Sequence, residues 1–233
     1  MKEKQAMPST YKEGVARVSH IVESVFPFEW EAKKRFEKWL DQKKIPMEKY
    51  MQVASSYWTA IHLWMENHIN GVSLEQEQYE PFLTKYVSFG IQWMKDYNVI
   101  PLEIEKYIQT EHYQGTIDLI AEIDGEKWIC DWKTYWIAQE VLNTKKEGSK
   151  YKKPYDKLKK AALQLSLYAY ACSIEHMHIG VVELAADWYH FHKLNLLPKE
   201  EFDKVINNYI WKERQQNAHT TVEQWVELKW EVI

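Results

Sequence analysis

The chain has 233 residues and a formal net charge of −4, with 45% hydrophobic and 27% charged residues. This is an ordinary mixture for a folded protein, and we expect one domain over residues 1–233. No apolar run approaches the roughly 18 residues that a membrane span needs, so no membrane partner is expected. The first residues, MKEKQAMPSTYKEG, lack the apolar stretch of a secretory signal.

Two cysteines, Cys130 and Cys172, are too few for a disulfide framework, an iron–sulfur cluster or a four-cysteine zinc site. A chain of this kind suits a reducing compartment, and we expect a cytoplasmic protein without an iron–sulfur cluster.

Hydrophobic spacing predicts three helices in the first part of the chain, over residues 26–44, about 47–70 and about 74–97. The second has Gly71 at its predicted end and carries two stripes. Its apolar stripe consists of Met51, Ala54, Trp58, Ile61 and Met65. Its polar stripe consists of Ser55, Thr59, His62 and Glu66.

The spacing changes after residue 98. Alternating patterns predict strands over residues 99–108, 115–123, 126–134, 178–185 and 188–194. Helical spacing returns over residues 156–173 and about 199–215, and residues 221–233 are ambiguous. The order predicts an α/β fold, with a mainly helical section over 1–97 and a small mixed sheet flanked by helices over 98–233.

Asp124 and Gly125 separate two of the predicted strands, and Asp-Gly favours a two-residue hairpin turn. The register that follows pairs Leu119 with Cys130, and then Asp118 with Asp131. Side chains alternate between the faces of a strand, so Lys133 shares the face of the two aspartates. The other face, which includes Ile117, is more apolar and is expected to pack on a helix.

Two opposed carboxylates destabilise a sheet unless a cation lies between them, and their Cβ atoms would be roughly 5 Å apart. A hard divalent cation such as Mg²⁺ takes oxygen ligands of this kind. Lys133 would orient a metal-bound water and stabilise charge on a phosphate. The alternative is a turn that slips by one residue and leaves both acids solvated.

Residues 145–160, KKEGSKYKKPYDKLKK, contain eight lysines and two acids. The segment is either a solvated loop or a contact for nucleic-acid phosphates, with Lys152 and Lys153 at its centre. Tyr135 and Trp136, next to the predicted site, are candidates to border a DNA strand, whereas Trp132 is expected to point into the core.

Several segments in order resemble the PD-(D/E)XK nuclease superfamily, in the RecB-like branch that includes phage and mitochondrial genome maintenance exonucleases. GTID over 115–118 and DWKT over 131–134 resemble its catalytic core, and QLSLY over 164–168 its Q-x-x-x-Y helix. ARVSHIV over 16–22 and SSYWTAIH over 55–62 resemble its N-terminal segment and its metal-binding histidine helix. Trp58 departs from the family, which usually has glycine there, and is expected to narrow the groove near His62.

The resemblance implies a restriction-endonuclease-like core that uses Mg²⁺ or Mn²⁺. It implies metal ligands at His62, Asp118, Asp131 and the carbonyl of Trp132. Lys133 would be the catalytic lysine and Glu103 a supporting acid. The residues that would support the site or contact DNA are Gln164, Tyr168, Tyr135, Lys152 and Lys153.

These features lead us to expect a metal-dependent DNA nuclease, first an exonuclease on single strands or DNA ends. The alternatives are a structure-specific endonuclease and a nucleic-acid-binding protein with a vestigial site. A separate zinc site would use the four histidines near the predicted fourth and fifth strands, His176, His178, His190 and His192. It requires a three-residue loop between those strands, because a two-residue turn puts the two histidine pairs on opposite faces.

Overall fold

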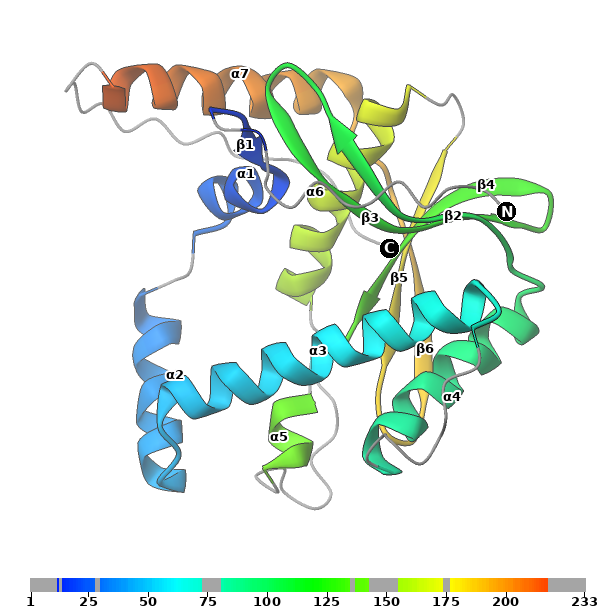
Figure 1. The fold of residues 1–233 in the computed structure, drawn as a ribbon. Coiled ribbons are helices and arrows are strands. Elements are labelled where there is room, and N and C mark those ends of the chain that lie inside the picture. The colour runs from blue at the N-terminus through cyan, green and yellow to red at the C-terminus, as the bar shows by residue number, and fades with distance from the viewer. Residues whose placement is uncertain are drawn as a thin grey trace.

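The computed structural model describes residues 12, 14–27, 30–72, 81–134, 137–142, 155–173 and 177–217. The helices are α1 Val18–Val25, α2 Trp30–Lys43, α3 Met47–Ile69, α4 Pro81–Asp96, α5 Ile137–Val141, α6 Tyr155–Cys172 and α7 Lys199–Asn217. The strands are β1 Ala16–Arg17, β2 Ile100–Gln109, β3 Tyr113–Ile123, β4 Glu126–Lys133, β5 His178–Leu184 and β6 Tyr189–Leu194. Figure 1 shows helices on both sides of the sheet.

The six strands form one mixed sheet in the order β1-β3-β4-β5-β6, with β2 also paired to β3. β1 with β3 and β4 with β5 are parallel, whereas the other pairs are antiparallel. Helices therefore precede a small mixed sheet that further helices cover. This confirms the α/β architecture and the helical N-terminal section that the sequence predicts.

The predicted hairpin register is confirmed from the turn as far as Leu119, which pairs with Cys130. The described ladder ends at that pair, whereas the pairing of β4 with β5 continues through Asp131, which pairs with Val181, to Lys133, which pairs with Glu183. The predicted direct pairing of Asp118 with Asp131 is therefore not part of this ladder. The two strands diverge where the aspartates stand.

β3 has a gap along one edge. β2 pairs along the opposite edge from Gln114 to Glu122. On the first edge, β1 pairs at Tyr113 and Gln114, and β4 pairs only from Leu119 onward. Residues 115–118 lie between these two pairings, in a region that we call the fork. The fork opens the sheet without breaking β3.

Both faces of the sheet are buried. Leu119, Ala121 and Cys130 belong to a hydrophobic cluster with residues of α3 and α4, as expected for the apolar face of the hairpin. Ile120 and Ile129 belong to a second cluster with residues of α1, α6 and α7. Ile117 also lies in this second cluster, so its predicted grouping with Leu119 is wrong. The strand changes face at the fork, where regular alternation fails.

Only part of the apolar stripe of α3 is buried. Ile61 and Met65 are fully buried, but Met51 is 55% exposed and Trp58 is 42% exposed. The first half of α3 stands away from the sheet beside α2 (Figure 1). Tyr50 at that end packs against Phe36 and Trp39 of α2. Helical periodicity alone cannot tell which apolar residues meet the sheet.

Several predictions fall on residues outside the described ranges. These are the loop residues Tyr135, Trp136, Lys152 and Lys153, as well as His176 and the ambiguous segment 221–233. Among the described helices, none is both long and apolar enough to cross a membrane.

The hairpin turn depends on left-handed backbone at Asp124 (φ 54°) and Gly125 (φ 80°). A Cβ at Gly125 would meet no atom within 4 Å, so any cost of Gly125→Ala comes from the backbone. We expect Gly125→Ala to lower the free energy of unfolding by about 1 kcal/mol. Urea denaturation measures this, with Asp124→Asn as a control that stays near the unsubstituted value. An unchanged midpoint for Gly125→Ala would contradict a strict left-handed turn.

Candidate active site

A cavity of about 470 Å³ opens at the fork. Its walls come from the start of α1, one face of α3, the fork of β3, the end of β4 and α6. The lining residues that carry ionisable or amide groups are Arg17, His62, Glu66, Glu105, Gln114, Asp118, Asp131, Lys133 and Gln164. Residues from distant parts of the chain thus meet where β3 and β4 separate.

Asp118 bridges the fork with its side chain. Its Oδ2 atom accepts a hydrogen bond of 3.0 Å from the backbone N–H of Trp132. This bond satisfies a backbone donor at the point where the two strands diverge. The same oxygen lies 3.5 Å from Nδ1 of His62 on α3. Asp118 therefore connects the sheet to the helix across the cavity.

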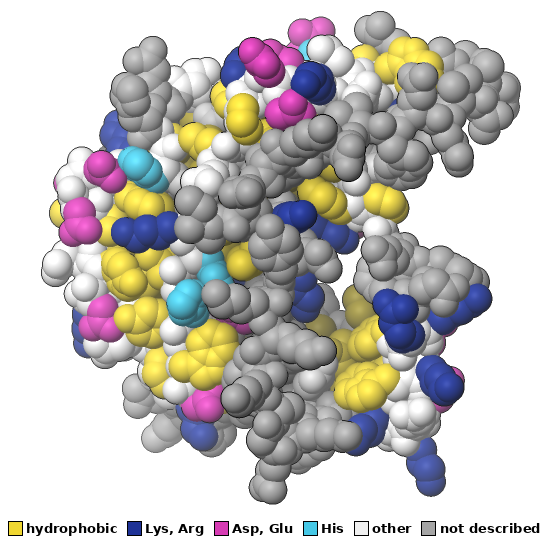
Figure 2. All heavy atoms as spheres, turned by 180° about the vertical axis from the view of Figure 1, so that it is seen from behind, with side chains coloured by type: hydrophobic (Ala, Val, Ile, Leu, Met, Phe, Trp, Pro, Cys, Tyr) yellow, Lys and Arg dark blue, Asp and Glu magenta, His cyan; other side chains and the backbone are white. Residues whose placement is uncertain are grey.

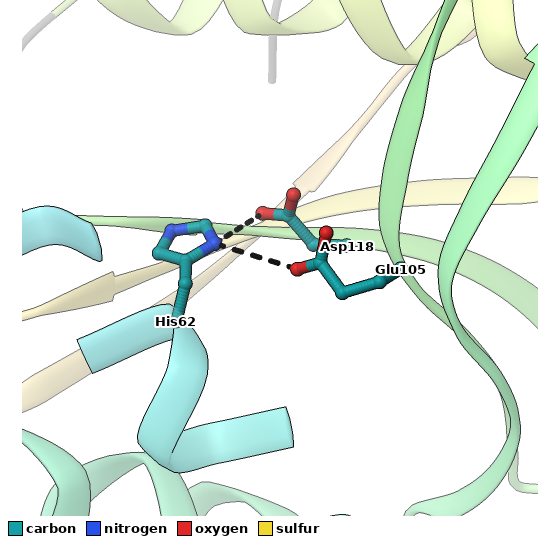
Figure 3. Close-up of side chains that lie close together, drawn as sticks. All are labelled: His62, Glu105 and Asp118. Atoms are coloured by element: carbon teal, nitrogen blue, oxygen red, sulfur yellow. Dashed lines mark ion pairs between the residues drawn. The ribbon is translucent and has the colours of Figure 1, made fainter. Parts of the chain in front are cut away.

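Glu105 reaches the same place from β2. The pairs on either side, Ile104 with Leu119 and Lys106 with Ile117, place Glu105 opposite Asp118. Glu105 has a left-handed backbone (φ 48°), which is unusual for a residue in a strand. Its Oε1 atom lies 3.9 Å from Nδ1 of His62 (Figure 3). Strained backbone thus holds a second carboxylate beside the first.

His62, Glu105 and Asp118 form a group whose possible ligand atoms lie within 4.8 Å of one another. Figure 3 shows both carboxylates directed toward the imidazole. Nε2 of His62 is buried and has no hydrogen-bond partner among the described residues. One imidazole and two carboxylates suit a divalent cation, which would also offset the repulsion between the acids. The residues present therefore fit a metal site.

The pKa of His62 reflects this crowding. Burial lowers the pKa, but Asp118 and Glu105 raise it by more, so the pKa lies above its ordinary value of 6.5. The neighbouring acids thus favour the protonated imidazole at the place where a cation would stand.

Asp131 and Lys133 form a second pair in the cavity. Nζ of Lys133 lies 2.6 Å from Oδ2 of Asp131, and Nε2 of Gln164 donates to Oδ1 at 3.4 Å. Burial raises the pKa of Asp131 to about 6, with Asp118 adding to the rise and Lys133 opposing it. Burial lowers the pKa of Lys133, but the two aspartates outweigh it and the net pKa is raised. The lysine therefore stays cationic beside the acids.

A single close contact explains why the GTID segment has a glycine and the QLSLY segment a tyrosine. A Cβ at Gly115 would lie 2.8 Å from Cε1 and 3.0 Å from the hydroxyl of Tyr168. Tyr168 thus packs directly on the backbone of the fork. Gln164, one turn earlier on α6, places its amide nitrogen 3.5 Å from the Tyr168 hydroxyl. The i, i+4 pair supports the fork and Asp131 together.

Gln114 is fully buried and holds the N-terminal segment next to the cavity. Its amide nitrogen donates to the carbonyls of Lys12 (2.8 Å) and Val15 (2.7 Å). Its Oε1 atom accepts from the N–H of Lys12 (2.8 Å) and the hydroxyl of Tyr107 (2.6 Å). The side chain thereby uses all its hydrogen-bonding capacity and fixes the start of α1 as a cavity wall.

The structure brings most of the residues predicted from the sequence into one cavity. They are His62, Asp118, Asp131, Lys133, Gln164 and Tyr168. The Trp132 side chain is buried in the core as expected, and its carbonyl as a ligand stays a prediction. Tyr135, Lys152 and Lys153 lie outside the described residues.

Glu103 does not enter the cavity. Its side chain is 49% exposed and pairs with Lys106 at 2.8 Å. Glu105 takes the place that the sequence assigned to Glu103, because the register shifts between Pro101 and Glu103 and the backbone turns left-handed at Glu105. Glu103 and Glu105 are two residues apart on β2 and would share a face of a regular strand. Alternation alone therefore could not choose between them. Pro101, next to the register shift, is the sequence feature that indicates an irregular strand here.

The separate zinc site is excluded for the described histidines. Leu184 pairs with Tyr189, and the N–H of Ala185 donates to the carbonyl of Trp188, which leaves a two-residue turn. This register places His190 and His192 on one face of the sheet and His178 on the other.

Comparisons with known proteins add little. No protein-family model matches the chain, and no curated protein matches it. A solved structure titled "Crystal structure of SSO0001" is similar over 87% of this chain and 78% of its own, with 13% identity and a TM-score of 0.39. A likeness at this level carries no argument about fold or function.

We expect the metal-free protein to show a His62 pKa above 6.5, and Asp118→Asn to lower it. The raised pKa stabilises the fold fully below 6.5, and this contribution is lost as the pH rises through the higher folded value. An NMR titration of the His62 ring in the presence of a chelator measures the pKa. A value at or below 6.5 would contradict the proximity of the carboxylates.

Without metal, we expect Glu105→Gly to leave the free energy of unfolding about 1 kcal/mol higher than Glu103→Gly does, since it removes left-handed strain while both changes carry the entropic cost of glycine. Glu105→Gly should also lower Mn²⁺ affinity at least about tenfold. Glu103→Gly is the matched control on the same strand, and should lose about 0.5–1 kcal/mol while it keeps Mn²⁺ affinity. Urea denaturation and calorimetric titration measure the two effects. Equal Mn²⁺ affinities for the two variants would remove Glu105 from the site.

Proposed function

We propose that the chain is a divalent-metal-dependent deoxyribonuclease of the PD-(D/E)XK superfamily, in its RecB-like branch, with a restriction-endonuclease-like core. One observation carries the proposal. The histidine–carboxylate group of His62, Glu105 and Asp118 lines the same cavity as the Asp131–Lys133 pair. Carboxylates that hold a cation, next to a buried lysine, form a hydrolytic set for phosphodiesters.

His62, Glu105 and Asp118 would hold the ion, with Asp131 and the Trp132 carbonyl as further candidates. A bound Mg²⁺ or Mn²⁺ would supply Lewis-acid polarisation of a phosphate and a lowered pKa for water. The charged Lys133 would stabilise the negative charge that develops on the phosphate oxygens. Gln164 keeps Asp131 oriented through its hydrogen bond, so the pair stays in place during the reaction.

An exonuclease on single strands or DNA ends, in the cytoplasm, is the first candidate, on the resemblance given above. The charge distribution supports a nucleic-acid substrate. Figure 2 shows the rear surface hollowed beside the arm of α2 and the start of α3, with Lys and Arg side chains around the hollow. Such cations suit a phosphate backbone. A structure-specific endonuclease would use the same site, and a vestigial binding protein would keep the surface alone.

Lys133→Met should lower metal-dependent cleavage of linear DNA by at least about 100-fold, because it removes the cation that stabilises the phosphate charge. Asp131→Asn should have a similar effect. Glu103→Gln, outside the cavity, should leave cleavage unchanged. The assay uses linear, end-blocked and circular DNA, with Mg²⁺ or with a chelator. Circular dichroism checks that each variant is folded.

The substrates separate the candidates. Cleavage of linear but not circular DNA supports the exonuclease, whereas cleavage of circles supports the endonuclease. Binding of DNA without metal-dependent cleavage of any substrate would sink the nuclease and leave the vestigial binding protein.

A further inference from the structure

Trp58 is a large apolar side chain in the wall of the cavity, and it is 42% exposed. On the same helix, Trp64 is 8% exposed and Ile61 is fully buried. Leu63, 49% exposed, also lines the cavity. The face of α3 toward the cavity therefore presents two exposed apolar side chains on either side of the buried His62.

The position of the indole is fixed by a direct contact. The ring centroids of Trp58 and His62 are 4.1 Å apart, with an interplanar angle of 42°. His62 belongs to the group that would hold a metal. The remaining exposed surface of the indole thus lies next to the place where a scissile phosphate would be bound.

The chemistry of the surroundings identifies the ligand. An exposed indole is an aromatic platform, and every nucleobase has a π-face that stacks on such a platform. Arg17 and Lys133 supply positive charge in the same cavity for the phosphates. Within a duplex both faces of a base are already stacked. An indole at this place therefore has a free partner at an unpaired nucleotide or on the outer face of the last base pair of a duplex end, and a single base on the indole is the simpler fit beside one phosphate.

We propose that Trp58 is the stacking platform for an unpaired nucleobase of single-stranded DNA, adjacent to the scissile phosphate. This inference rests on the proposed nuclease function and deepens it, because it makes an unstacked nucleotide the substrate. Trp58 is a positioning and specificity residue that holds the strand.

The test is a double-mutant cycle that combines a substitution in the protein with removal of the bases from the oligonucleotide. Binding of a single-stranded oligonucleotide is measured by fluorescence anisotropy in the Asp131→Asn background with Mg²⁺, with and without Trp58→Leu. A matching oligonucleotide has abasic sites in place of the bases. We expect Trp58→Leu to weaken binding of the normal oligonucleotide by about 5- to 100-fold and of the abasic one by less than about twofold. Trp58→Phe should recover part of the loss.

Trp211 on α7 provides the matched control, because it is a tryptophan with similar exposure (39%) that does not line the cavity. Trp211→Leu should leave both affinities unchanged. The second readout is calorimetric Mn²⁺ titration of Trp58→Leu. If Trp58 only covered His62, this substitution would change the affinity for Mn²⁺. Equal losses on normal and abasic oligonucleotides would overturn the stacking role, and so would unchanged binding of both.

Parallel cleavage by the unsubstituted chain separates this inference from the nuclease proposal. A base-dependent loss of binding without any cleavage would leave the platform in place and overturn the nuclease. Cleavage that Trp58→Leu leaves unchanged on single strands, together with unchanged binding, would keep the nuclease and overturn the platform.

Discussion

The candidate site depends on the separation of β3 from β4 at the fork. The two strands pair from the turn to Leu119 and Cys130, and then β4 follows β5. The hydrogen bond from the Trp132 N–H to the Asp118 carboxylate spans the opening and satisfies a backbone donor there. Without the divergence, Asp118 and Asp131 would stand as an ordinary cross-strand pair and leave no room for a cavity between β3 and α6. Because the strands diverge, the Asp118 carboxylate bridges them and is also a candidate metal ligand.

The local features of this arrangement were predictable from the sequence, but the divergence was not. Asp124 and Gly125 need left-handed backbone, and that requirement alone gave the correct register up to Leu119. Beyond that point β4 continues in its parallel pairing with β5, which follows in the chain only after α6. Such a long-range pairing leaves no mark in the spacing of one hairpin. For the same reason the alternation that placed Leu119 correctly failed at Ile117.

The side chains of the candidate site show the same limit of prediction from sequence. His62 was expected in the site, and the structure buries it there beside Asp118. Glu105 rather than Glu103 completes the group because one residue of β2 has a left-handed backbone, which a pattern of two acids cannot reveal. Helical spacing groups Trp58 with Ile61 on one apolar stripe, but it cannot tell which members of the stripe are buried. The first half of α3 leaves the sheet and exposes the indole.

The four hydrogen bonds of Gln114 have a consequence for motion. Three of them join β3 to the N-terminal segment, about a hundred positions earlier in the chain, and the fourth comes from the Tyr107 hydroxyl of β2. The segment itself adds only a two-residue strand to the sheet. A local opening that released this wall of the cavity would break these few bonds together with the packing of α1 in its hydrophobic cluster, while the strands from β2 to β6 stayed paired. The width of the entrance is thus tied to how firmly the N-terminal segment is held.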